Sequence, residues 1–110
     1  DSFPELFLKY HAQKRECPFP VLIFGHIGDR NLHVNFLPSS REELNTARDK
    51  ALALSLTAIK MEGTISSEHG IGKKKKELLA AMYAPKTIDQ MKQIRSFWDP
   101  SGILNSGNLF

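Results

Sequence analysis

Two histidines of this chain flank a short stretch that is rich in turn-forming residues. His26 and His33 stand on either side of residues 27–32, which include Gly28 and Asp29. If the chain reverses there as a hairpin, the two imidazoles come side by side and can bind one divalent ion together. Imidazole suits zinc, iron, cobalt or manganese. Asn35 follows His33 by two residues, so a strand would place both side chains on the same face.

A second segment, Ser67–Gly72, carries an acid next to a histidine. Glu68 can supply an oxygen ligand to the same ion. Three protein ligands with an open position are typical of a catalytic metal site. His69 would then be a free imidazole beside a cation that lowers its proton affinity, so it could accept a hydroxyl proton near neutral pH.

Each of these features also has a structural interpretation. A single histidine on a strand, such as His33, is often only a hydrogen-bonded residue, and glycines near turns mostly serve the turns. His11, within a predicted helix, is expected at the surface, and Cys17, beside prolines, is expected to be an inert thiol. From the residues alone, a metal or acid–base site and a purely structural role both stay open.

The elements that would position these residues alternate between helix and strand. Apolar spacing predicts a helix over 3–16, and the run Val21–Phe24 predicts a central, fully covered strand. Residues 31–37 alternate, with Leu32, Val34 and Phe36 on the face predicted to meet the core. Further predictions are a helix from Ser39 to about Met61 ended by Gly63, a strand over 63–67, helices over 73–83 and 85–98, and an ordered loop or tail over 101–110. The order predicts an α+β fold with a small antiparallel sheet covered by helices.

Composition excludes several classes of protein. The chain has 110 residues, one domain by length, and a net charge of +3. The positive excess comes from Lys73–Lys76, so the charge is not spread as in a nucleic-acid binder. This run is interpreted as a solvated face, with an anion or acidic-lipid contact as the alternative. No apolar run is long enough for a transmembrane segment, and no secretory signal is recognised. One cysteine excludes an internal disulfide and favours a reducing compartment.

Three separated stretches resemble one known family. Gly25–Asn35 resembles Gly-His-x-Gly-Asp-Gly-Asn-x-His-x-Asn, Ser67–Lys75 resembles Glu-His-Gly-Ile-Gly-x-x-Lys, and Asp99–Leu109 resembles Asp-Pro-x-x-x-Leu-Asn-Pro-Gly-Lys. These motifs are those of the C-terminal domain of the FAD-linked oxidases in the vanillyl-alcohol-oxidase superfamily. The most similar branch contains glycolate oxidase, D-lactate dehydrogenase and D-2-hydroxyglutarate dehydrogenase.

The resemblance implies a fold, a reaction and roles for individual residues. The fold is the ferredoxin-like C-terminal domain, of which residues 1–110 would be only the C-terminal part. His26, His33 and Glu68 would hold a divalent metal, with zinc or manganese expected, that grips the carboxylate and hydroxyl of a 2-hydroxy acid. His69 would be the catalytic base while hydride leaves for the flavin. Asn35 would bind substrate, and Asn105 would touch FAD.

The sequence departs from the family pattern in two places. Arg30 stands where the family has Gly, so a side chain either strains a turn that needs positive φ or adds a cation near an anionic substrate. Ser106 and Asn108 replace the closing Pro and Lys, which weakens the assignment of Asn105.

The predicted partners lie largely outside this chain. The N-terminal FAD-binding domain of the same polypeptide is expected to be absent from these residues, so the chain alone is expected to be inactive and colourless. A cytoplasmic or peripheral membrane location, mitochondrial in a eukaryote, is the expectation; the oligomeric state and the particular hydroxy acid leave no readable mark. Two alternatives remain: a non-catalytic, partner-binding module of the same fold, and a structural metal-binding domain.

Overall fold

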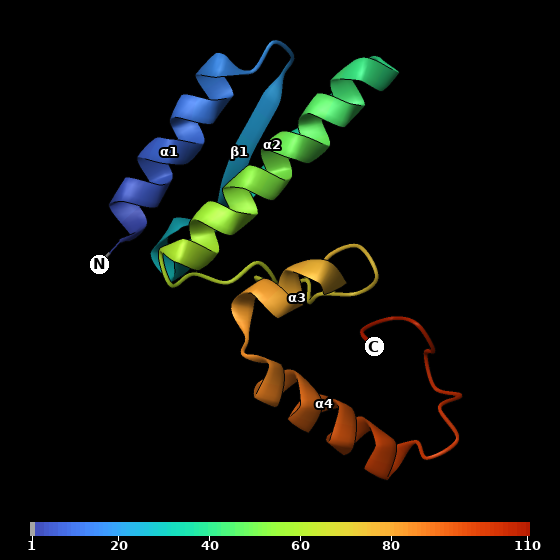
Figure 1. Ribbon diagram of the computed structural model, residues 1–110. Helices are drawn as coiled ribbons and strands as arrows, with labels where there is room; N and C mark the ends of the chain where they lie inside the picture. The colour runs from blue at the N-terminus through green and yellow to red at the C-terminus, as the bar shows by residue number, and fades with distance from the viewer. Residues whose placement is uncertain (1) are drawn as a thin grey trace. The chain divides into compact units, whose positions relative to one another are not determined.

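The computed structural model describes residues 2–110, which form two compact units. The first unit ends at Glu62 and contains α1 (Phe3–Glu16), β1 (Val21–His26), the 3-10 helix η1 (Ile27–Asp29), β2 (Asn31–Phe36) and α2 (Arg41–Lys60) (Figure 1). The second unit, Gly63–Phe110, contains α3 (Lys76–Met82) and α4 (Pro85–Trp98). The predicted α+β class with a small antiparallel sheet is confirmed. No helix within residues 2–110 has the length and apolar character needed to cross a membrane.

The sheet is the hairpin of β1 and β2, and its register decides which side chains share a face. Val21 pairs with Phe36, and His26 pairs with Asn31 next to the turn. Side chains alternate across a strand, so the pairing sorts them into two sets. One face carries Val21, Ile23, Leu32, Val34 and Phe36; the other carries Leu22, Phe24, His26, Asn31, His33 and Asn35. The predicted alternation of β2 is therefore confirmed.

The core of the first unit lies where the two long helices meet the hairpin. α1 contacts both α2 and β1, and Figure 1 shows α1 and α2 running alongside β1. The buried side chains of this unit are Phe19, Val21, Ala47, Leu54 and Ala58. The small and apolar side chains at 47, 54 and 58 recur at helical spacing, so α2 presents one stripe to this core.

The prediction that Val21–Phe24 is a fully covered strand is wrong. Val21 is buried, but Leu22 is 50% exposed and Phe24 is 52% exposed. The described sheet has only two strands, so β1 has a single hydrogen-bonded neighbour. The two exposed side chains lie on the same face of the hairpin as His26 of β1 and His33 of β2.

α2 begins and ends with local hydrogen bonds. Ser40 is the N-cap, and its Oγ accepts from the Glu43 backbone N–H at 3.1 Å. The Glu43 carboxylate in turn accepts from the Ser39 N–H at 2.6 Å, so the first turn is closed from both sides. At the other end the left-handed residue is Glu62, with φ +62°, rather than the predicted Gly63.

The second unit begins with irregular backbone instead of the predicted strand over 63–67. Ser67, Gly70 and Gly72 have φ values of +47°, +75° and +58°, and left-handed residues interrupt extended backbone. The predicted helix over 73–83 also begins later, at Lys76, because residues 73–75 are turns. The buried apolar side chains of this unit are Ile65 and Leu79.

α4 and the C-terminal tail follow the prediction closely. Pro85 opens the helix, where its missing N–H costs nothing. After Trp98, the buried Asp99 accepts hydrogen bonds from the backbone N–H groups of Ile103 and Leu104 at 3.1 and 2.9 Å. Arg95 donates to the carbonyls of Leu104 and Phe110 at 3.0 and 3.3 Å. These bonds hold the tail in an ordered loop, as predicted.

Candidate metal centre

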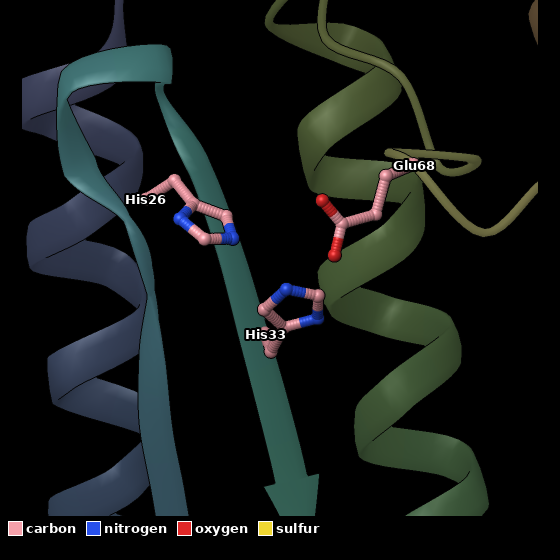
Figure 2. A group of neighbouring side chains, drawn as sticks. All are labelled: His26, His33 and Glu68. Atoms are coloured by element: carbon pink, nitrogen blue, oxygen red, sulfur yellow. The ribbon is translucent and has the colours of Figure 1, made fainter.

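The hairpin brings His26 and His33 together on its open face. His33 pairs with Phe24 and His26 with Asn31, so the histidines are diagonal neighbours across the two strands. Their ring centroids lie 6.4 Å apart with an interplanar angle of 78° (Figure 2). His26 is exposed and His33 is half-buried. The predicted juxtaposition of the two imidazoles is therefore present within the first unit.

This spacing fits two ligands of one ion with a small adjustment. A metal–nitrogen bond of about 2.1 Å places a ring centroid about 3.2 Å from the ion, so two rings at a tetrahedral angle lie about 5 Å apart. The observed 6.4 Å is larger than this, so the two rings would have to approach each other to bind one ion. His26 is exposed at the end of β1. His33 has less freedom, because its ring stacks on Phe24 at 5.1 Å and 21°.

The backbone in and beside the turn between the histidines is unusual. Gly25 has φ +145°, and a Cβ there would lie 2.3 Å from the carbonyl oxygen of Asn31, so a side chain is excluded. Arg30 has φ +56°, and its N–H donates to the carbonyl of Ile27 at 3.1 Å. The positive φ expected at the family's glycine position is thus present, and an arginine adopts it.

Asn35 lies on the same hairpin face as the histidines, as predicted. It pairs with Leu22, and its side chain is exposed. The face therefore presents two imidazoles and an amide beside the exposed Leu22 and Phe24.

Glu68 and His69 lie in the irregular segment that opens the second unit. The His69 Nε2 stands 3.6 Å from a Glu68 carboxylate oxygen, and the two side chains are 61% and 50% exposed. The backbone N–H of His69 donates a hydrogen bond to the backbone carbonyl of Ser66 at 3.0 Å, which closes a turn. The Glu68 side chain carries the carboxylate that was predicted as the third, oxygen ligand, and Figure 2 draws it together with the two histidines.

Asn105 lies in the tail, with φ +48°, and lines an apolar pocket of about 430 Å³ within the second unit. The other lining residues are Met91, Ile94, Arg95, Leu104, Asn108, Leu109 and Phe110. This pocket was not predicted from the sequence. The signal was the helical spacing of Met91, Ile94 and Arg95 followed by an apolar tail, a pattern that equally fits a packed core.

Comparison with known proteins places these features in a family. Residues 2–109 match the family described as FAD linked oxidases, C-terminal domain. The chain is 36% identical to D-2-hydroxyglutarate dehydrogenase of Stutzerimonas stutzeri (strain A1501), over 84% of this chain and 21% of that protein. It is 35% identical to glycolate oxidase subunit GlcD of Bacillus subtilis (strain 168), over 82% and 20% of the two chains.

A third relative extends the range of substrates named in this group. The chain is 35% identical to D-lactate dehydrogenase of Anaerostipes hadrus, over 94% of this chain and 22% of that protein. The chain thus spans about a fifth of the length of the curated relatives it matches. Because the family match covers nearly all of its residues, this chain belongs to the C-terminal domain family of the FAD-linked oxidases.

Proposed function

We propose that this chain supplies one side of the active site of an FAD-dependent dehydrogenase or oxidase of 2-hydroxy acids. The observation that carries the proposal is the pair His26–His33 on an open hairpin face, in a chain of the FAD-linked oxidase family. The relatives are named for D-2-hydroxyglutarate, glycolate and D-lactate. Each of these acids carries a hydroxyl on the carbon next to a carboxylate.

His26, His33 and Glu68 are proposed to hold a divalent cation, with zinc or manganese expected. Support comes from the donor set, two imidazoles and one carboxylate, which suits either ion, and from the spacing of the two rings. When bound, the cation would grip the carboxylate and hydroxyl of the substrate and ease loss of the hydroxyl proton. Asn35, on the same face as His33, is proposed to donate a hydrogen bond to the substrate.

His69 is proposed to accept the hydroxyl proton. The side chain of His69 is 61% exposed, so a substrate proton can reach its ring. The ring also stands beside the Glu68 carboxylate, at 3.6 Å. FAD, when bound, would take the α-hydrogen with its electron pair, and the 2-hydroxy acid would become a 2-oxo acid. Asn105 is proposed to contact the flavin, and an FAD-binding domain of the same polypeptide is proposed to hold most of that cofactor.

The test uses the full-length protein, purified with its flavin and supplied with zinc or manganese. Anaerobic addition of D-lactate, glycolate or D-2-hydroxyglutarate should bleach the flavin band, and the responding acid names the substrate. His69→Ala should slow bleaching by about 100-fold or more, the usual contribution of a general base. His11→Ala is the matched control, since His11 lies on α1 and its ring contacts that of Phe7 in a tilted arrangement at 4.4 Å. Equal rates in the two variants would remove His69 from the mechanism.

A second experiment tests the metal ligands without relying on turnover. His33→Ala should lower the affinity for Mn²⁺, measured by electron paramagnetic resonance, by at least about 100-fold, because it removes a direct ligand. Chelation should abolish oxidation and leave the fold intact. If chelation instead unfolds the protein, the metal is structural.

One observation favours the alternative of a non-catalytic, partner-binding module. Arg30 places a long cationic side chain in the turn between the two histidine strands, where the resembled motif has glycine. Under this alternative, a yellow protein would be bleached by none of the three acids, and Arg30→Gly would not restore the reaction. Recovery of bleaching in Arg30→Gly would instead identify the arginine as the reason for a silent site.

A further inference from the structure

Lys75 differs from its three lysine neighbours. Its ammonium donates a hydrogen bond to the carbonyl oxygen of Ile65, with an Nζ–O distance of 2.6 Å. Lys75 is half-buried, while Lys73, Lys74 and Lys76 are exposed. The interpretation of the whole run as a solvated face therefore fails at this one position, and the Lys75 side chain has an internal partner.

The Lys75–Ile65 bond closes the segment that carries the proposed acid and base. Ile65 is 7% exposed, so one end of the segment is anchored by a buried side chain. Lys75 is the N-cap of α3, so the other end is the start of a helix. Between these ends, residues 66–74 contain no helix or strand, and Glu68 and His69 lie among them.

The backbone of this segment is irregular. Its left-handed residues, Ser67, Gly70 and Gly72, leave the regular hydrogen-bond ladders. Left-handed backbone at a non-glycine residue such as Ser67 persists where surrounding interactions impose it. The Lys75–Ile65 bond joins the two ends of this segment. Its donor is charged, and such a hydrogen bond is stronger than one between neutral groups.

We propose that Lys75 is a positioning residue that fixes the segment 66–74 and so orients Glu68 and His69. This inference rests on the proposed function of those two residues. Lys75 itself touches neither substrate nor cation in this role; it acts through the backbone of Ile65. Its removal should loosen the segment without changing the chemistry of the side chains that the segment carries.

The experiment compares Lys75→Met with Lys74→Met in the full-length protein. Lys74→Met is the matched control, because it removes the same charge from an exposed neighbour. Amide hydrogen exchange of a peptide covering 65–75 should be about 10- to 100-fold faster in Lys75→Met only, the range expected for loss of a charge-assisted hydrogen bond. Exchange of α1 and α2 should not change.

Two further measurements link the segment to the proposed chemistry. In Lys75→Met the dissociation constant for Mn²⁺ should rise and kcat should fall, each by about 10-fold or more, if Glu68 and His69 spend less time in place. KM should change less than kcat. Lys75→Arg keeps a cationic donor and should recover most of both effects. If Lys75→Met does not fold, Lys75→Gln, with a shorter neutral donor, replaces it.

The outcomes separate this inference from the proposed function. Equal exchange in Lys75→Met and Lys74→Met overturns the positioning role, as does a loosened segment with unchanged Mn²⁺ affinity and kcat. A wild-type protein that neither binds Mn²⁺ nor oxidises a hydroxy acid refutes the proposed function itself, and the positioning role with it. Loosening of 65–75 together with weaker Mn²⁺ binding and lower kcat, rescued by arginine, supports both.

Discussion

Replacing Arg30 by glycine should stabilise the hairpin that carries the two histidines. Arg30 adopts φ +56° and ψ +29° at the end of η1. A left-handed conformation costs a residue with a Cβ about 1–2 kcal/mol. Glycine avoids this cost, but it lowers the free energy of unfolding by about 0.4–1 kcal/mol, because it gives the unfolded chain more conformational freedom. The net gain expected for Arg30→Gly is therefore about 0.5–1 kcal/mol, which is a two- to five-fold shift in the opening equilibrium.

The comparison that isolates the backbone is Arg30→Gly against Arg30→Ala. Both variants remove the guanidinium and whatever interactions it makes, but only alanine keeps the Cβ. The assay is amide hydrogen exchange over 21–36, which reports the free energy of local opening. Exchange should be slower in the glycine variant than in the alanine variant by about the two- to five-fold factor above.

One result would refute this reasoning directly. If Arg30→Gly exchanges as fast as Arg30→Ala or faster, the left-handed turn does not store the expected energy. Gly25→Ala provides the opposite extreme within the same hairpin, since the added Cβ would meet the Asn31 carbonyl. That variant should open the hairpin far more than either change at position 30.

Three further predictions concern stability. Asp99→Ala should speed exchange in the tail 101–110 by about 10-fold or more, because the carboxylate accepts two backbone N–H bonds. Unchanged exchange would show that this carboxylate does not hold the tail. Ser40→Ala should lower the stability of α2 by about 1 kcal/mol, which would be seen as faster amide exchange in its first turn, whereas Ser40→Asp should keep the capping hydrogen bond. Burial raises the pKa of Tyr10 above 10.0, so the folded protein favours the neutral phenol. The contribution of Tyr10 to the free energy of unfolding is therefore complete below pH 10 and is lost as pH rises through the folded-state pKa. Tyr10→Phe should flatten that alkaline decline in denaturant unfolding, and an unaltered decline would assign it to other groups.

The helices could be predicted from sequence because local signals determine them. Pro at the start, a break after Glu16 and the Ser40 cap all act within one or two turns, and α1 and α4 begin and end where their residues predict. The hairpin was predictable for the same reason, since alternation along Asn31–Phe36 records which face is buried. Local chemistry thus sufficed to place His26 and His33 together.

What could not be predicted depends on partners elsewhere in the molecule. A run such as Val21–Phe24 has the same apolar character whether one or two strands flank it, and here Leu22 and Phe24 stay exposed. The stretch 63–67 has strand-like residues but lacks a strand pairing. On α4, Ile94, Phe97 and Trp98 fit a core stripe, yet they are 63–77% exposed. Apolar spacing predicts that a helix or strand has an apolar face, but it does not predict which part of the molecule packs against that face.

The candidate ligands and base share one property that sequence motifs only suggest. His26 and His33 are separated by a turn with Gly25 and Arg30 in positive-φ conformations beside it, and Glu68 and His69 lie between Ser67 and Gly70, which are also left-handed. Such backbone costs energy and survives where surrounding interactions impose it. Arg30 and Ser67 are the informative members, because glycine would adopt these angles without that cost. A chain selected for stability alone would place glycine there. Arg30 and Ser67 therefore mark the two turns that hold the proposed parts of the site: the histidine pair of the hairpin and the acid–imidazole pair of the second unit.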